Sequence, residues 1–128
     1  STVAANSAGA ALQILGSSSA VTWSVVSNRG TGDAIDFLNG HHGVIEQSTA
    51  ASSSGFGILL LNSADNTVRD DYIQGATGLR LSGATRTSVL RSRLIATVLA
   101  GNGLYHTSGQ DAFVSSCVVT GGGGGLGL

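Results

Sequence analysis

The sequence predicts an all-β solenoid, and two observations lead to this fold class. A motif with a small residue followed by apolar, variable and apolar positions occurs five times along the chain. Its leading apolar residues are separated by 23, 23, 21 and 25 positions: Leu12, Ile35, Ile58, Leu79 and Leu104. Between the motifs, short alternating segments are separated by Ser, Asn, Gly and Asp clusters, which is typical of strands and turns. Because one coil cannot bury its apolar side alone, we expect the coils to stack around a continuous core.

Two further apolar tracks follow the motif in each repeat. The second track lies nine or ten residues after the leading apolar residue and is expected to face the core: Val21, Val44, Val68, Val89 and Phe113. The third track lies five residues further on: Val26, Thr49, Ile73, Leu94 and Val118. Neighbouring coils should lie about 4.8 Å apart, so equivalent residues should form ladders along the solenoid. Asn39 and Asn62 are one such pair, at a turn.

The predicted domain organisation is one solenoid domain over residues 1–128. Residues 1–10 form part of an N-terminal coil, residues 11–120 form five coils, and residues 121–128 form a glycine-rich turn and the start of a further coil. The chain contains 20 glycines and no proline. This composition fits a fold in which nearly every strand is paired on both sides, because proline cannot donate to a strand ladder.

Composition excludes several classes of protein. Hydrophobic residues make up 41% and charged residues 10%, which argues against a disordered chain. The net charge is −1 and all six basic residues are Arg, so a nucleic-acid partner is not expected. No apolar run approaches the roughly 18 residues that a membrane span requires. Cys117 is the only cysteine, which rules out an intrachain disulfide.

The segment from Gly57 to Gly75, GILLLNSADNTVRDDYIQG, resembles the repeat of right-handed parallel β-helix proteins. This family includes pectate-lyase-like enzymes, periplasmic NosD-type proteins and phage tailspikes. The resemblance is close over residues 55–77, fair over 78–119 and weaker over 8–54. It implies a right-handed parallel β-helix at an extracellular location or on a virion surface. It does not define an activity, because this scaffold carries lyases, hydrolases, epimerases and purely structural segments.

Charged side chains gather on one strip of the predicted solenoid. Stacking is expected to place Glu46 beside Asp70 and Asp70 beside Arg91, with Asp71 one position further along. One interpretation is a polysaccharide-cleaving site, in which paired carboxylates perform acid–base chemistry. Alternatively, the carboxylates bind Ca²⁺ and an Arg is the base of a β-elimination, although no motif for a calcium or other cofactor site is recognisable. The competing interpretation is a ladder of ion pairs in which Arg91 and Arg93 neutralise Asp70 and Asp71.

Three aromatic residues are candidate platforms for stacking a sugar ring: Trp23, Tyr72 and Tyr105. They fall in different coils and, on the predicted register, do not form one row. His106 takes a core-facing position that is apolar in the other repeats. We expect it to be a hydrogen-bonded histidine near the end of the core.

Both ends of the chain fall within unfinished coils on the predicted register. Val3 and Leu12 mark one end, and Leu126 and Leu128 mark the other. The end of a solenoid exposes unpaired strand edges and core side chains. We therefore expect these ends to join something else. The alternatives are a longer β-helix, capping by other chains, end-to-end stacking of copies, or a trimeric bundle.

The leading functional hypothesis is a structural, surface-displayed β-helix that assembles with other chains or copies and faces glycans. A virion tail fibre or spike and an extracellular filament are the settings expected for it. One alternative is a polysaccharide lyase, hydrolase or epimerase that uses the charged strip. The other is a carbohydrate-binding module without catalysis.

Overall fold

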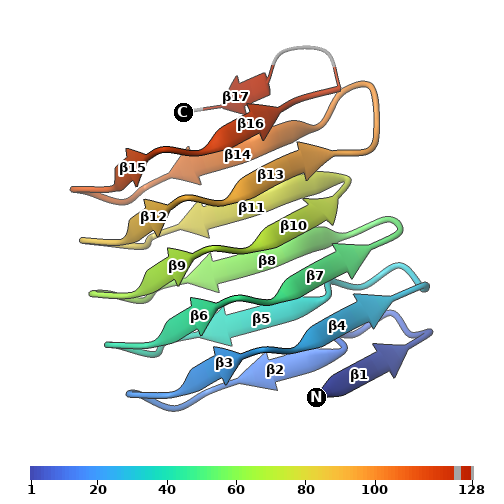
Figure 1. Ribbon diagram of the computed structural model, residues 1–128, viewed down its shortest axis with the longest axis horizontal. Helices are drawn as coiled ribbons and strands as arrows, with labels where there is room; N and C mark the ends of the chain where they lie inside the picture. Colours follow the sequence, from blue (N-terminus) through green and yellow to red (C-terminus); the bar gives the residue numbers. More distant parts are fainter. Residues whose placement is uncertain (123–124, 128) are drawn as a thin grey trace.

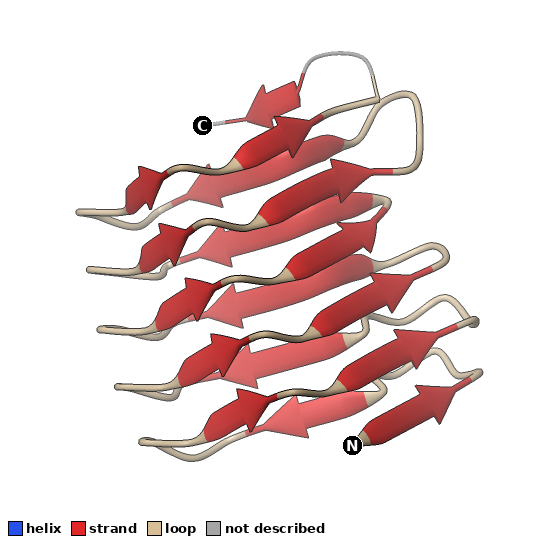
Figure 2. Ribbon diagram, viewed as in Figure 1, coloured by secondary structure: helices blue, strands red, loops and turns tan. Residues whose placement is uncertain are grey.

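The computed structural model describes residues 1–122 and 125–127, and within them it contains strands and turns but no helix. The chain winds into a stack of similar coils, each of which adds one strand to each of three sheets (Figures 1 and 2). Sheet A contains β1 (Thr2–Ala5), β4 (Val25–Asn28), β7 (Thr49–Ser52), β10 (Tyr72–Gly75), β13 (Arg93–Ala96) and β16 (Val118–Thr120). Sheet B contains β2 (Leu12–Ile14), β5 (Ile35–Leu38), β8 (Phe56–Leu61), β11 (Thr77–Ser82), β14 (Asn102–Thr107) and β17 (Gly125–Gly127). Sheet C contains β3 (Ala20–Thr22), β6 (Val44–Glu46), β9 (Thr67–Arg69), β12 (Ser88–Leu90) and β15 (Phe113–Ser115).

Every named strand pair is parallel and joins equivalent segments of neighbouring coils. This confirms the predicted parallel β-solenoid of about five coils. The first apolar track is also confirmed, because sheet B pairs its members in sequence: Leu12, Ile35, Ile58, Leu79 and Leu104. Within the core, Ile35, Ile58 and Leu79 have no exposed surface.

The prediction for the second track was wrong in two coils. Val21 pairs with Ile45 rather than Val44, and Ile45 is 2% exposed whereas Val44 is half-buried on the outer side. In the last full coil Val114 takes the register position, while Phe113 is 59% exposed. The error arose because adjacent residues in both places are apolar, so composition alone does not select the inward one.

The same one-residue error affected the third track. Ala50 pairs with Val26 and is 1% exposed, whereas the predicted Thr49 lies on the outer face. Val118 is likewise exposed, and Val119 packs against the core in its place. The predicted spacing of five residues between the second and third tracks was right. An error of one residue in the second track therefore caused the same error in the third.

Each coil bends at corners where a single residue, nearly always other than glycine, adopts a positive φ. Asn39 and Asn62 lie at the corner that follows sheet B, with φ of 55° and 48°. Their main-chain N–H groups donate to the carbonyls of the next coil, at 2.9 Å in both cases. The predicted equivalence of these two asparagines is therefore correct. Left-handed backbone costs a non-glycine residue about 1–2 kcal/mol, and the hydrogen bonds between coils offset this cost.

The main-chain register at both ends agrees with the predicted repeat. Val3 pairs with Val26, and Leu126 pairs with Leu104. Leu128 lies outside the described residues. Within the described part of the chain, there is no helix long and apolar enough to span a membrane.

Candidate binding groove at the corner between sheets C and A

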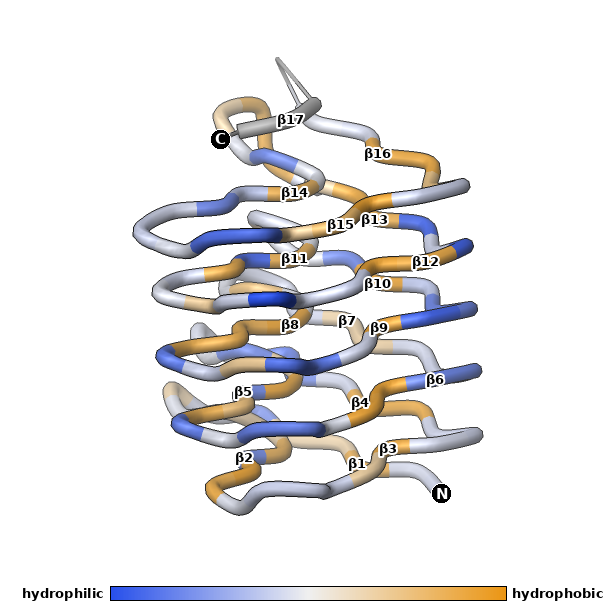
Figure 3. The backbone as a smooth tube through the Cα atoms, turned by 90° about the vertical axis from the view of Figure 1, so that its left-hand side faces the viewer, coloured by the Kyte–Doolittle hydropathy of each residue, from blue (hydrophilic) through white to orange (hydrophobic). Residues whose placement is uncertain are grey.

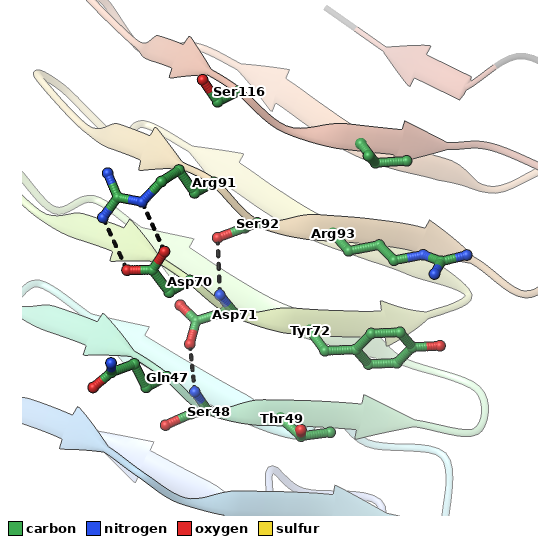
Figure 4. A pocket seen from close by; sticks show the side chains of 11 residues that line it. Gln47, Ser48, Thr49, Asp70, Asp71, Tyr72, Arg91, Ser92, Arg93 and Ser116 are labelled. Atoms are coloured by element: carbon green, nitrogen blue, oxygen red, sulfur yellow. Dashed lines mark hydrogen bonds and ion pairs between the residues drawn. The ribbon is translucent and has the colours of Figure 1, made fainter.

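A shallow groove of about 530 Å³ follows the corner where each coil passes from sheet C to sheet A (Figure 4). Its walls come from equivalent positions in four successive coils. The lining residues are Gln47, Ser48, Thr49, Asp70, Asp71, Tyr72, Arg91, Ser92, Arg93, Ser116 and Val118. The groove therefore runs across the strands, along the solenoid axis.

The outer rim of the groove consists of the residues that turn the corner. All have φ between 44° and 57°, and they stack in one row: Trp23, Gln47, Asp70, Arg91 and Ser116. The main-chain N–H groups of the first four donate to carbonyls of the next coil, so their side chains are not needed for the ladder. Trp23 is 71% exposed and stands one coil beyond Gln47. The predicted stacking put Glu46 beside Asp70, in the place that Gln47 occupies.

Asp70 does lie beside Arg91, as the predicted stacking implies. Two parallel hydrogen bonds join them, from Arg91 Nε to Asp70 Oδ1 at 2.8 Å and from Nη2 to Oδ2 at 2.9 Å. Hydrogen bonding to Arg91 lowers the pKa of Asp70 below its ordinary value. The predicted contact between Glu46 and Asp70 was wrong, because Glu46 pairs with Arg69 at 2.6 Å. The one-residue shift of the second track explains this error.

Asp71 points into the solenoid and belongs to a different row. It is 4% exposed, and its neighbours in the row are Ser48, which is 5% exposed, and Ser92, which is 3% exposed. The Ser48 N–H donates to Asp71 Oδ1 at 2.8 Å, and the Asp71 N–H donates to Ser92 Oγ at 3.1 Å (Figure 4). Both serine hydroxyls also donate to the carbonyl two residues earlier, at 2.9 and 2.8 Å. A carboxyl group thus replaces a hydroxyl in a ladder of serines.

The position of Asp71 favours its protonated form. Burial raises the pKa of Asp71 to about 7, although the main-chain groups of Ser48 and Arg69 act in the opposite direction. Asp71 Oδ2 is buried and has no hydrogen-bond partner among the described residues. In the flanking coils, the equivalent serine hydroxyl donates a proton to a main-chain carbonyl. A protonated Asp71 would do the same, whereas an ionised one would leave a buried charge uncompensated.

Tyr72 and Arg93 form the sheet A side of the groove. Tyr72 is 39% exposed, and its hydroxyl donates to Gln74 Oε1 at 3.2 Å. The guanidinium carbon of Arg93 lies 5.9 Å from the centre of the Tyr72 ring. Arg93 therefore stacks on an aromatic ring, and the predicted Arg93–Asp71 ion pair is not among those present.

The remaining candidates lie elsewhere. Tyr105 is in β14 of sheet B, where its ring packs against Arg80, so it does not share a surface with Tyr72. His106 pairs with Leu81, as predicted, but its Nε2 is buried without a hydrogen-bond partner in the described residues. Among residues 1–122 and 125–127, no group of three or more His, Cys, Asp or Glu side chains could hold a metal ion.

Sequence reasoning missed Gln47 and Thr49, which line the groove. A signal for them exists in the spacing. In coils two to five, the inward residue of the second track lies ten positions after the leading apolar residue, as Ile45 does after Ile35 and Val68 after Ile58. Applying this spacing uniformly would have placed Gln47 on the corner, level with Asp70.

Chemically, the groove offers hydrogen-bond donors and acceptors beside the aromatic ring of Tyr72. Four polar side chains that line the groove reach solvent: Gln47, Thr49 and the ion-paired Asp70 and Arg91. The arrangement differs from a pair of free carboxyl groups, because Asp70 is held by Arg91 and Asp71 is buried.

Comparisons with known proteins agree with this architecture. The family model described as a right-handed β-helix region matches residues 2–128. Among solved structures, the chain is similar to one described as a "putative glycosyl hydrolase from Parabacteroides merdae ATCC 43184". The identity is 15% and the TM-score 0.60, over 77% of this chain and 44% of that one, so this likeness concerns the fold alone. The chain thus spans less than half of that structure, and no curated protein matches it. Because the family model covers nearly the whole sequence, the chain belongs to the right-handed β-helix family.

Proposed function

We propose that the chain is a surface-displayed β-helix that binds a carbohydrate polymer along the corner groove without cleaving it. The observation that carries this proposal is the composition of the rim. Tyr72 lines the groove beside a corner row that is polar in four successive coils and is continued in the first coil by the exposed Trp23. Aromatic faces pack against apolar ring faces, while amide, carboxylate and guanidinium groups bond to hydroxyls.

The geometry supports binding because the polar groups are fixed in advance. The bidentate contact between Asp70 and Arg91 holds both planar groups in one orientation, and the Arg93 guanidinium rests on the Tyr72 ring. Ordering a flexible side chain on binding costs about 0.5–1.5 kcal/mol, so groups that are already ordered bind more favourably. Equivalent groups about 4.8 Å apart suit a ligand that is itself a repeating polymer. Such polymers are presented at an extracellular or virion surface, which is where we place the chain.

A polysaccharide-cleaving enzyme is the second candidate, and one observation favours it. The pKa of Asp71 is raised to about 7 while that of Asp70 is lowered, and carboxyl pairs with diverging pKa values are found in acid–base catalysts. Burial of Asp71 argues against this role, because its free oxygen does not reach the groove. The likeness to the Parabacteroides merdae structure supports a glycan-related role only in general terms.

Binding can be tested with immobilised glycans, followed by calorimetry with the best ligand. Replacing Tyr72 or Gln47 with Ala should weaken binding by about tenfold or more, which is about 1.4 kcal/mol. The matched control is Tyr105→Ala, which removes an aromatic ring from the opposite face and should leave affinity unchanged. Equal loss in the control, or no bound glycan at all, would contradict the groove as the site.

The same ligands distinguish the two candidates. Incubation with the wild-type chain should leave the polymer length unchanged when measured by size-exclusion chromatography. If the polymer shortens and the Asp71→Asn variant abolishes the shortening, the chain is an enzyme. In that case the non-catalytic proposal is wrong.

A further inference from the structure

The outer face of sheet B is unusually apolar for a solvent-facing surface. Its leucine and phenylalanine side chains come from neighbouring coils, and most are half-buried: Leu15, Leu38, Phe56, Leu59 and Leu61. Leu15 is 65% exposed. Figure 3 shows the strands of this face, β2, β5, β8 and β11, stacked along the solenoid. We refer to these five side chains as the leucine face.

Two residues of opposite charge lie on the outer face of sheet B, one coil to either side of Leu59. Strand pairing places Asp36 beside Leu59 and Leu59 beside Arg80, so the three form one row across β5, β8 and β11. Asp36 and Arg80 are therefore two coils apart, which is about 9.6 Å. The three ion pairs recorded among the described residues all join adjacent coils. At a separation of two coils, Asp36 and Arg80 do not pair within one chain.

Both residues also have an unsatisfied polar atom. Asp36 Oδ1 and Arg80 Nε are each buried and lack a hydrogen-bond partner in the described part of the chain. Such groups are rare, because leaving a buried polar group unpaired costs about 1–3 kcal/mol. The guanidinium carbon of Arg80 is held between two rings, 5.1 Å from the centre of Phe56 and 5.4 Å from that of Tyr105. The cation is thus fixed in place without an anion.

The surroundings of Asp36 reinforce this imbalance. Asp33 is the titratable group beside it, and Asp33 Oδ1 is already bonded to the Phe56 N–H at 2.6 Å. Burial, together with hydrogen bonding and repulsion from Asp33, raises the pKa of Asp36 to about 7. A cation brought to this face would relieve these unfavourable interactions.

We infer that the leucine face binds a second copy of this chain in an antiparallel, two-fold arrangement. The two-fold axis lies between the two copies, parallel to β8 and directly above Leu59. Rotation about it reverses the order of the coils. It places Asp36 of each copy opposite Arg80 of the other, and Leu59 opposite Leu59. The contact is isologous, so each charge pair forms twice and the assembly closes as a dimer.

The size of the face predicts a weak dimer. The outer face of sheet B spans β2, β5, β8, β11 and β14, which lie about 4.8 Å apart and have up to six residues of about 3.3 Å each, giving a flat area of roughly 20 by 20 Å. This is below the roughly 800 Å² per partner of a standard stable interface. We therefore expect a dissociation constant in the micromolar range or weaker, with affinity dependent on the two charge pairs and on ionic strength.

Sedimentation velocity at increasing protein concentration tests the dimer. Wild-type protein should shift from monomer to dimer and no further. Asp36→Arg and Arg80→Asp should each raise the dissociation constant by more than about tenfold, because each brings like charges together twice. The double variant, in which the two charges are exchanged, should restore dimerisation. Arg29→Asp, on a different surface, is the matched control and should dimerise like wild type.

Chemical cross-linking provides a readout that does not depend on the charge variants. In a Cys117→Ser background, Leu59→Cys should give a covalent dimer with a short bis-maleimide, because the two cysteines meet at the axis. Ala51→Cys, in the middle of sheet A, should not. Three results would each overturn the inference. The protein could stay monomeric at all concentrations, the charge-exchanged double variant could fail to dimerise, or long particles could form irrespective of the charge reversals. The last outcome would instead indicate end-to-end stacking.

Discussion

Replacing Asp71 with Asn is expected to stabilise the protein at neutral pH, although it removes a buried hydrogen-bonding group. The pKa of this carboxyl is raised from 3.8 to about 7 in the folded chain. Folding therefore favours the protonated form. The associated stability is fully present below about pH 4 and is lost as the pH rises to about 7. A change of this size corresponds to at most about 4 kcal/mol, and local relaxation should reduce it to about 2 kcal/mol.

An asparagine at this position can make both bonds of the protonated carboxyl at any pH. Its oxygen can accept from the Ser48 N–H. Its amide N–H can donate to the carbonyl two residues earlier in its own coil, as the hydroxyl groups of Ser48 and Ser92 do in theirs. Urea unfolding followed by circular dichroism should thus show little difference from wild type near pH 4. Near pH 8 the variant should be more stable by about 2 kcal/mol. Asp71→Ser, the residue used in the flanking coils, should behave similarly.

Two results would refute this reasoning. One is a variant that is less stable than wild type near pH 8. The other is a free energy of unfolding that increases between pH 4 and 7 in the wild type and increases by the same amount in the variant. Asp36 has a similarly raised pKa and would leave some of the same pH dependence in the variant. The double variant Asp36→Asn, Asp71→Asn should therefore be the flattest of the series.

Three other changes should have measurable effects on unfolding. Leu60→Ala should destabilise by about 2–5 kcal/mol in urea, because Leu60 is fully buried between equivalent residues of the adjacent coils. Gly43→Ala should cost about 1–3 kcal/mol, because a methyl group there would meet the ring of Phe37; a smaller loss in the Phe37→Leu background would identify that contact as the cause. The pKa of Asp65 is lowered by hydrogen bonding to Arg86, so the contribution of this pair is present above the ordinary carboxyl pKa and is lost as the pH falls below it. Asp65→Asn should therefore lower the urea midpoint slightly at neutral pH, and the difference from wild type should vanish in high salt or strong acid.

The repeat was predictable because the solenoid imposes the same burial on each coil. Ile58, Leu79 and Leu104 are separated by 21 and 25 residues, yet all occupy one ladder, because the differences in length are absorbed in the turns. The phase of the shorter strands was harder to predict. Val44 and Ile45 are both apolar, and only the pairing with Val21 and Val68 shows that Ile45 faces inward.

The site was less predictable because it depends on differences of a single residue. Asp70 and Asp71 are adjacent in the sequence, and nothing in their composition indicates that one is exposed and ion-paired while the other is buried. The positive φ of Asp70, 57°, separates their directions. A left-handed corner is not evident in a residue other than glycine, so this division of roles could not be predicted from the pattern alone.

The corners explain how this solenoid can carry a binding surface without loss of fold. At a corner, the main chain makes the bonds between coils, so a side chain such as that of Gln47 is available to contact a ligand. Packing therefore places little constraint on the side chain at a corner, although the residue has to tolerate a positive φ. The opposite holds one position further on. Asp71 has to make the hydrogen bonds of a buried row, and its burial makes ionisation of its carboxyl group costly. Function is thus expected to change at the corner row, and changes at the adjacent inward row should be read first as changes in stability.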